Sequence, residues 1–278
     1  MRLIKLLILK FFSHFGYSIN KKYELPETNL LRKRFAEITD YEIELIKKCQ
    51  SFTMTSDLRM WHLIRAFYWV RNKNVQGDFV ECGVWEGGNL ILLQNLLEKN
   101  NIDNKIIYGF DTFEGMVEPT LENDGLQAYE EFQYIKKNNL KWCDATLEKV
   151  KSNFIENTSY SKTESHASNK KRGHWEEMTG ANQKINNLKL IKGKVEDTLK
   201  VEINIPSEIS ILRLDTDFYE STKIELEVLY KNLSQNGILI IDDYGSWMGS
   251  KKAVDEFFCD KKVELFYIDE GSRFLIKL

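Results

Sequence analysis

The sequence has few of the residues that mark special classes of protein. It contains 3 Pro and 15 Gly among 278 residues, and 42% of its residues are hydrophobic. Disordered and collagen-like chains are therefore excluded, and enough apolar residues are present for one large core. Positive charge is not in excess, because 39 Lys and Arg stand against 42 Asp and Glu, for a formal net charge of −3. This balance excludes a strongly basic nucleic-acid-binding protein, and we expect no nucleic-acid partner.

Cysteine is also scarce. The four cysteines are Cys49, Cys82, Cys143 and Cys259. They are far apart in the sequence and form no CxxC pair, so we expect neither a disulfide framework nor a Cys-ligated zinc site. We interpret them as reduced thiols of a cytoplasmic protein.

The N-terminal segment, residues 1–12, is apolar but short. Lys5 and Lys10 interrupt it, and it is shorter than the ~20 residues that a helix needs to span a bilayer. The residues that follow offer no clean cleavage site for a signal peptide. We expect a helix packed on its own domain or on a second subunit of a homo-oligomer. The alternative is a cationic helix in weak contact with a membrane surface, which would place the protein peripherally at the membrane.

Hydrophobic periodicity divides the chain into a helical N-terminal part and an α/β part. Residues 27–74 are predicted to be helical, and Ser56 is a plausible N-cap within them. After Gly77, short apolar runs typical of strands alternate with helical segments. Strands are expected at 78–82, 105–111, 188–192, 209–214 and 237–242, with helices at 87–97, 222–233 and 251–258. This order predicts βαβ units in a doubly wound, Rossmann-like and mostly parallel sheet.

Two further features complete the predicted domain. Residues 263–268 and 273–277 are expected to form a closing antiparallel hairpin. Residues 151–187 are too long and polar for an ordinary connection, and we expect a mobile, lid-like insertion there. We therefore divide the chain into an N-terminal helical extension, residues 1–56, and a second domain, residues 57–278, which contains the insertion.

A glycine-containing turn follows the first predicted strand. Gly83 and Gly87 would allow a ligand to approach the backbone closely, at the edge where open parallel sheets bind their ligands. The spacing is not the GxGxxG of dinucleotide-binding proteins, and Glu81 and Glu86 would disfavour a pyrophosphate. An acidic turn instead suits the positively charged end of S-adenosylmethionine. The alternative is an ordinary turn whose glycines only allow packing.

Two more carboxylates could complete a cofactor site. Asp111 ends the second predicted strand, where it could accept hydrogen bonds from both hydroxyls of an adenosine ribose. Asp197 follows the third predicted strand, where it could accept a hydrogen bond from the adenine amine.

Acidic residues also mark the ends of the fourth and fifth predicted strands. Asp215 and Asp217 follow the fourth strand, and Asp242 and Asp243 lie at the end of the fifth. Because neighbouring parallel strands end at the same edge of a sheet, Asp215, Asp242 and Asp243 are expected to cluster as hard oxygen ligands, with Mg²⁺ as the occupant. Helix or turn capping could explain one of the four aspartates but hardly all of them.

Four motifs in these regions resemble the macrocin O-methyltransferase (TylF) family. They are residues 77–88, 108–116, 212–222 and 240–244, and they occur in the family's order. The resemblance extends from about Phe52 to the C-terminus. It implies a class I, S-adenosylmethionine- and Mg²⁺-dependent O-methyltransferase that acts on a hydroxyl of a sugar or a glycosylated compound.

The resemblance also implies site residues. The family's metal aspartates correspond to Asp215, Asp242 and Asp243. Its cofactor turn corresponds to Glu81, Gly83 and Gly87.

The group that would accept the hydroxyl proton is open to two interpretations. Asp215 could be base as well as ligand, and His166 or His174 in the polar insertion could instead close over the acceptor. Two other functions are possible: a methyltransferase for a catechol-like acceptor, or a non-catalytic scaffold that keeps the fold. The clustered aspartates argue against a scaffold, which does not need them.

Overall fold

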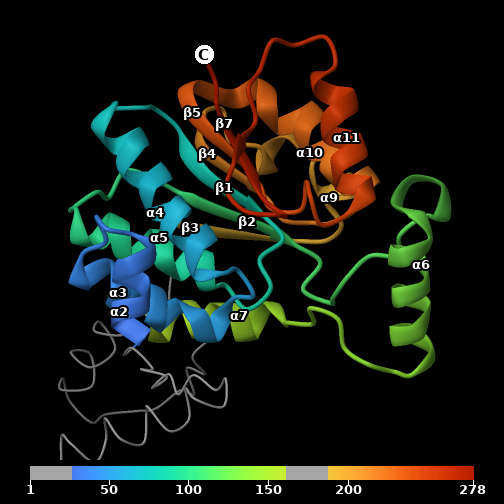
Figure 1. Cartoon of the computed structure of the whole chain (residues 1–278), viewed down its shortest axis with the longest axis horizontal. Coiled ribbons are helices and arrows are strands. Elements are labelled where there is room, and N and C mark those ends of the chain that lie inside the picture. The colour runs from blue at the N-terminus through green and yellow to red at the C-terminus, as the bar shows by residue number, and fades with distance from the viewer. Residues whose placement is uncertain (1–26, 161–186) are drawn as a thin grey trace, which may run out of the picture. The chain divides into compact units, whose positions relative to one another are not determined.

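The structure, a computed structural model, describes residues 27–160 and 187–278 (Figure 1). Its contacts divide the chain into a small unit, Met1–Ile43, and a large unit, Glu44–Leu278. Residues 1–12, for which the sequence predicts an apolar helix, lie outside the described residues.

The small unit contains helix α2 (Glu27–Arg34) and the start of α3 (Asp40–Cys49). A capping box begins α3: the Glu42 carboxylate accepts a hydrogen bond from Thr39 N at 2.8 Å, and the Thr39 hydroxyl accepts one from Glu42 N at 3.3 Å. The division between the two units comes after Ile43, whereas the sequence analysis ended its N-terminal extension at residue 56; the two-domain division stays a prediction.

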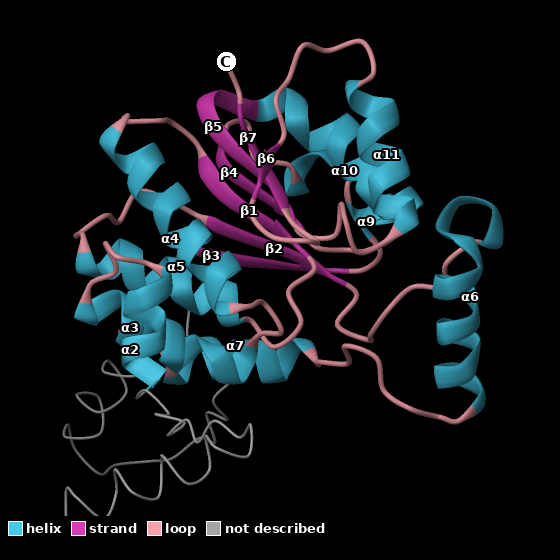
Figure 2. Ribbon diagram, in the orientation of Figure 1, coloured by secondary structure: helices cyan, strands magenta, loops and turns pink. Residues whose placement is uncertain are grey.

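The large unit is built on one seven-stranded sheet with the order β3-β2-β1-β4-β5-β7-β6 (Figure 2). The strands are β1 (Asp78–Cys82), β2 (Ile107–Asp111), β3 (Leu188–Lys192), β4 (Ile209–Leu214), β5 (Leu233–Ile241), β6 (Phe266–Tyr267) and β7 (Arg273–Ile276). Strands β1 to β5 are parallel, whereas β7 pairs antiparallel with β5 and with β6. The predicted doubly wound sheet with a C-terminal antiparallel hairpin is confirmed.

Helices cover both faces of this sheet, with α4, α5 and α7 on one side and α9, α10 and α11 on the other (Figures 1 and 2). Their bounds are α4 (Asp57–Asn72), α5 (Gly88–Lys99), α7 (Leu147–Glu156), α9 (Val195–Thr198), α10 (Tyr219–Leu229) and α11 (Met248–Phe258). Short 3-10 turns are η1 (Gln50–Phe52), η2 (Glu202–Asn204) and η3 (Tyr230–Asn232). Because all six residues of β4 are buried, its apolar side chains form the centre of the core.

Helix α6 (Leu121–Lys137) follows β2 and stands apart from the sheet (Figure 1). Its first turn is held by Asp124, whose carboxylate accepts hydrogen bonds from Thr120 N and from Tyr219 N, the first residue of α10, both at 2.7 Å. A non-helical residue, Gly125, with φ of 80°, comes directly after this anchor. No element was assigned to this region from the sequence.

The beginning of the predicted insertion, residues 151–187, differs from expectation. Residues 151–156 complete α7, where Asn153 and Phe154 are buried. The Asn153 side chain donates a hydrogen bond to Glu86 O at 3.0 Å. The polar composition concealed the helical spacing of Val150 and Phe154, which pack into the core. The next part of the insertion, residues 161–186, lies outside the described residues.

Within the described parts of the chain, no helix is long and apolar enough to cross a membrane.

Candidate active site

The strand ends that the sequence marked meet at one edge of the sheet, where residues that follow β1, β3 and β4 and the last residues of β2 line an open cavity. Open parallel sheets bind their ligands at this edge. Its wall includes Gly83, Asp111, Glu196 and Asp215.

Gly83 lies where β1 and β4 end side by side. Its φ is 84°, and a Cβ atom there would clash with Asp215 O. Glycine is therefore required both by the left-handed backbone and by the close approach of the neighbouring strand. Gly87, with φ of 91°, is the N-cap of α5 and is not part of the cavity wall. Both glycines allow close packing with neighbouring residues, Gly83 with Asp215 and Gly87 with Val150. Of the two, only Gly83 also borders the cavity.

Glu81 is not an open acid at the cavity entrance. Its side chain is 2% exposed and accepts hydrogen bonds from Arg213 Nη1 at 2.7 Å and from Asn89 Nδ2 at 2.9 Å. Burial raises the pKa of Glu81 to about 7, against the lowering effect of Arg213. Glu81 therefore pairs with the buried Arg213 and does not face the cavity. Its position at the end of a strand did not reveal this pairing.

Asp111 borders the cavity and also holds the turn after β1. Its Oδ2 accepts hydrogen bonds from Val84 N at 2.7 Å and Trp85 N at 3.1 Å, and its Oδ1 accepts one from Phe113 N at 2.6 Å. The Thr112 hydroxyl also lies 3.4 Å from Oδ1, but its single proton has a shorter bond to Gly115 O at 2.6 Å. Because a carboxylate has about four acceptor positions, one of those on Asp111 can serve a ligand. Asp111 thus lies where the sequence placed it, with a second task that the sequence did not indicate.

Asp197 lies outside the cavity wall. Its side chain is 72% exposed and forms an ion pair with Lys200 at 3.2 Å. The preceding residue, Glu196, does line the cavity, and its Oε2 is buried with no hydrogen-bond partner among the described residues. The structure therefore brings Glu196 to the cavity, and not Asp197, to which the sequence analysis gave the cofactor contact.

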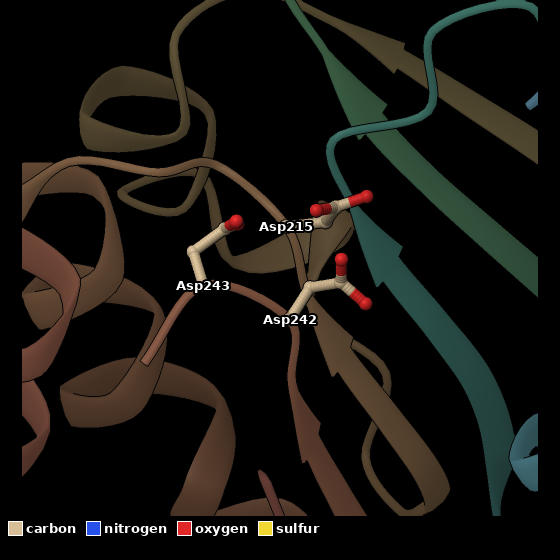
Figure 3. Close-up of side chains that lie close together, drawn as sticks. All are labelled: Asp215, Asp242 and Asp243. Atoms are coloured by element: carbon tan, nitrogen blue, oxygen red, sulfur yellow. The ribbon is translucent and has the colours of Figure 1, made fainter. Parts of the chain in front are cut away.

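Asp215, Asp242 and Asp243 cluster at the ends of β4 and β5 (Figure 3). Each offers one carboxylate oxygen, and these oxygens lie within 4.8 Å of one another. Burial and neighbouring carboxylates raise the pKa of Asp243 well above its ordinary value. Its Oδ2 is buried without a hydrogen-bond partner in the described parts of the chain. An unpartnered buried carboxylate oxygen beside two other carboxylates fits a hard divalent cation.

Two arginines that sequence reasoning missed balance part of this negative charge. Arg213 Nη1 donates to Asp215 Oδ2 and its Nη2 to Asp242 Oδ1, both at 2.7 Å. Arg59, from the first turn of α4, donates to Asp242 Oδ2. The one available signal for Arg213 was its position, a charged residue inside a buried strand, where it must be paired.

Asp217 and three aromatic rings border the acidic cluster. Asp217 has φ of 67°, and burial raises its pKa to about 7. The next residue, Phe218, packs against Trp142 and Trp247 with ring centroids 6.1 and 5.8 Å away. Trp247 N donates to Asp243 O at 3.0 Å, so both sides of the aromatic group are fixed to the acidic turns. His166 and His174, the alternative catalytic bases, lie outside the described residues.

Similar proteins are named O-methyltransferases. The chain is 28% identical over 223 residues to demethyldecarbamoylnovobiocin O-methyltransferase of Streptomyces niveus, which covers 79% of this chain and 73% of the relative. It is 29% identical over 193 residues to the 8-demethyl-8-(2,3-dimethoxy-alpha-L-rhamnosyl)-tetracenomycin-C 4'-O-methyltransferase of Streptomyces olivaceus, covering 69% and 62% of the two chains.

A solved structure agrees. The structure of the O-methyltransferase NovP is similar with a TM-score of 0.62 and 26% identity, over 81% of this chain and 82% of that one. The macrocin-O-methyltransferase (TylF) family matches residues 28–161 and 181–275, which include the acidic cluster and every described strand except the last residue of β7. The chain therefore belongs to the macrocin-O-methyltransferase (TylF) family and is an O-methyltransferase.

Proposed function

We propose that this O-methyltransferase transfers a methyl group from S-adenosylmethionine to a hydroxyl of a sugar or a glycosylated compound, with the help of Mg²⁺. One observation carries the proposal: Asp215 borders the cavity and also belongs to the acidic cluster. A cofactor in the cavity and a cation on the cluster would therefore share one wall, which is the arrangement that a metal-assisted transfer between them needs.

The cavity residues fit the cofactor. S-adenosylmethionine supplies a methyl group activated by the positive charge on sulfur. Gly83 permits close approach to the backbone, while Asp111 has an acceptor position for ribose hydroxyls. The unpartnered Oε2 of Glu196 offers an acceptor to a donor on the ligand, such as an amine. We therefore assign to Glu196 the contact that the sequence analysis gave to Asp197.

The acidic cluster fits a magnesium ion. Asp215, Asp242 and Asp243 would hold it, and it would supply Lewis-acid stabilisation to the developing negative charge on the acceptor oxygen. The role of the chain is to fix these carboxylates: Arg213 bridges Asp215 and Asp242 and thereby sets their separation.

Asp217 is better placed than Asp215 to accept the hydroxyl proton. Asp215 Oδ2 is engaged by Arg213, and its other oxygen is needed for the cation. Asp217 stands two residues further along the same turn and lies close enough to Asp215, Asp242 and Asp243 to interact with their carboxylates. Trp142 and Trp247, which pack on the buried Phe218 ring, would give the acceptor an apolar wall next to the base.

The names of the relatives support a glycosylated acceptor. The tetracenomycin enzyme acts on a rhamnosyl group, and the mycinamicin relative from Micromonospora griseorubida is likewise an O-methyltransferase for a natural product. No contact among the described residues favours a catechol-like acceptor. The cytoplasmic location and the homo-oligomeric state predicted from the sequence stay predictions.

Two measurements test the function. Isothermal titration of the full chain with S-adenosylmethionine should show binding without added metal. Mass spectrometry of a panel of glycosides and sugar nucleotides, incubated with enzyme and cofactor, should then show a methyl increment that disappears with excess chelator. Absence of cofactor binding contradicts the assignment of the cavity, whereas equal product formation with chelator contradicts the role of the metal.

Glu196 and Asp197 form a matched pair for the cofactor site. Glu196→Gln should weaken S-adenosylmethionine binding about tenfold, because it replaces a charged acceptor inside the cavity by a neutral one. Asp197→Asn, on the exposed side of the same turn, should leave the affinity unchanged. Titration calorimetry of both variants decides the assignment: a loss with Asp197→Asn and none with Glu196→Gln would return the contact to Asp197.

A further inference from the structure

Arg59 joins three segments that are far apart in the sequence. Its Nε and Nη2 donate to the two oxygens of Asp269 at 2.7 and 2.9 Å, and its Nη1 donates to Asp242 Oδ2. Asp269 lies in the turn between β6 and β7, where its Oδ1 also accepts hydrogen bonds from Gly271 N at 3.0 Å and Ser272 N at 2.8 Å. The guanidinium is thus held in a fixed orientation by a turn that is itself ordered.

This contact restrains the carboxylate of Asp242 from a second side. Arg213 Nη2 donates to Oδ1 at 2.7 Å, while Arg59 donates to Oδ2. Rotation of the carboxylate would break at least one charge-assisted hydrogen bond in a site where the Asp242 side chain is 6% exposed. Each oxygen keeps a second acceptor position, so the remaining lone pairs point in set directions.

We propose that Arg59 is a positioning residue that orients Asp242 for the divalent cation, a role that rests on the metal site proposed above. Two effects of Arg59 oppose each other here. Its positive charge repels a cation, whereas its two-sided hydrogen bonding orders the ligand. Lysine keeps the charge but lacks the planar fork, so Arg59→Lys isolates the ordering effect.

Gly271 offers a second way to move the guanidinium without changing any charge. A Cβ atom there would clash with Arg59 Nη2 and Ser246 Oγ, which are the ends of flexible side chains. The φ of Gly271 lies outside the left-handed region, so alanine adds no backbone strain. Gly271→Ala should therefore displace Arg59 from its pocket and leave the fold in place.

The test is Mn²⁺ binding by the full chain alone, without cofactor or acceptor, followed by the electron paramagnetic resonance signal of free Mn²⁺. We expect Arg59→Lys and Gly271→Ala each to weaken Mn²⁺ affinity by about tenfold or more, the range found when the support of a metal ligand is removed. The control is Arg71→Lys in the exposed last turn of α4, where the Arg71 side chain donates a long bond of 3.4 Å to the adjacent Asn72. The Mn²⁺ affinity of this variant should equal that of the wild type.

The outcomes separate this inference from the proposed function. Binding by the wild type, with equal or tighter binding by both variants, would show that Arg59 acts only as a charge and would overturn the inference. Absence of Mn²⁺ binding by the wild type would overturn the metal site itself and this inference with it. Thermal unfolding of each variant reports whether it is folded, and if one variant is unfolded the other decides.

Discussion

Replacing Asp243 with Asn should lower metal-dependent methyl transfer by about 100-fold or more and at the same time stabilise the fold. The variant loses one of the three clustered ligand oxygens. It also removes a buried charge whose Oδ2 has no hydrogen-bond partner among the described residues. Without metal, the free energy of unfolding should therefore rise by about 1 kcal/mol, measured by urea denaturation in chelator.

Asp242→Asn is the matched comparison. Both oxygens of Asp242 accept hydrogen bonds from guanidinium groups, so its neutralisation leaves Arg59 and Arg213 partly unpaired. Activity should again fall, but here the free energy of unfolding should drop by about 3 kcal/mol. If both variants lose the same free energy of unfolding, the Asp243 carboxylate must have a stabilising hydrogen-bond partner, and the reason given for its effect on stability is wrong. If Asp243→Asn keeps full activity, Asp243 is not a ligand.

S-adenosylmethionine affinity should be nearly unchanged in Asp243→Asn, since Asp243 does not line the cavity. The measurement separates loss of the cation from collapse of the cofactor site. A large loss of S-adenosylmethionine affinity would show that the acidic cluster and the cofactor cavity are not independent sites.

The strand ends could be predicted from the sequence because they are marked locally, by an apolar stretch with acidic residues at its end. Each of β1, β2, β4 and β5 contains a mainly apolar stretch, and a parallel sheet must place the carboxyl ends of such strands at one edge. The clustering of Asp215, Asp242 and Asp243 follows from this geometry alone.

The partners of these residues could not be predicted, because they depend on side-chain contacts between distant segments. Glu81 has the same type of position as Asp111, yet Arg213 draws it beneath the site while Asp111 borders the cavity. Arg59 stands 183 residues before Asp242 in the chain, and only the packed fold brings the two together. The sequence also does not show whether Glu196 or Asp197 faces the cavity. These two adjacent acids lie on one short helical turn, and its orientation decides which of them does.

Arg213 should be the single most costly polar residue to remove. Its side chain is 3% exposed and donates to Glu81, Asp215 and Asp242, with a fourth bond from Nη2 to Thr55 Oγ1 at 3.0 Å. In Arg213→Met, these three carboxylates lose their shared counter-charge in a buried site. The free energy of unfolding should fall by about 3–5 kcal/mol, the cost of breaking a buried ion pair by removing one partner.

The paired variant Glu81→Gln with Arg213→Met tests whether the loss comes from unbalanced charge. Removing the Glu81 charge as well should recover part of the stability, because Glu81 is fully buried beside the vacated position. Urea denaturation of the two single variants and the double variant, in chelator and at one pH, gives the coupling free energy. Additive losses would mean that Glu81 and Arg213 contribute independently, and the arginine would then matter for packing. If the double variant recovers about 1 kcal/mol or more of the free energy of unfolding, as is typical of coupling between contacting charges, the role of Arg213 is to balance the acids of the site.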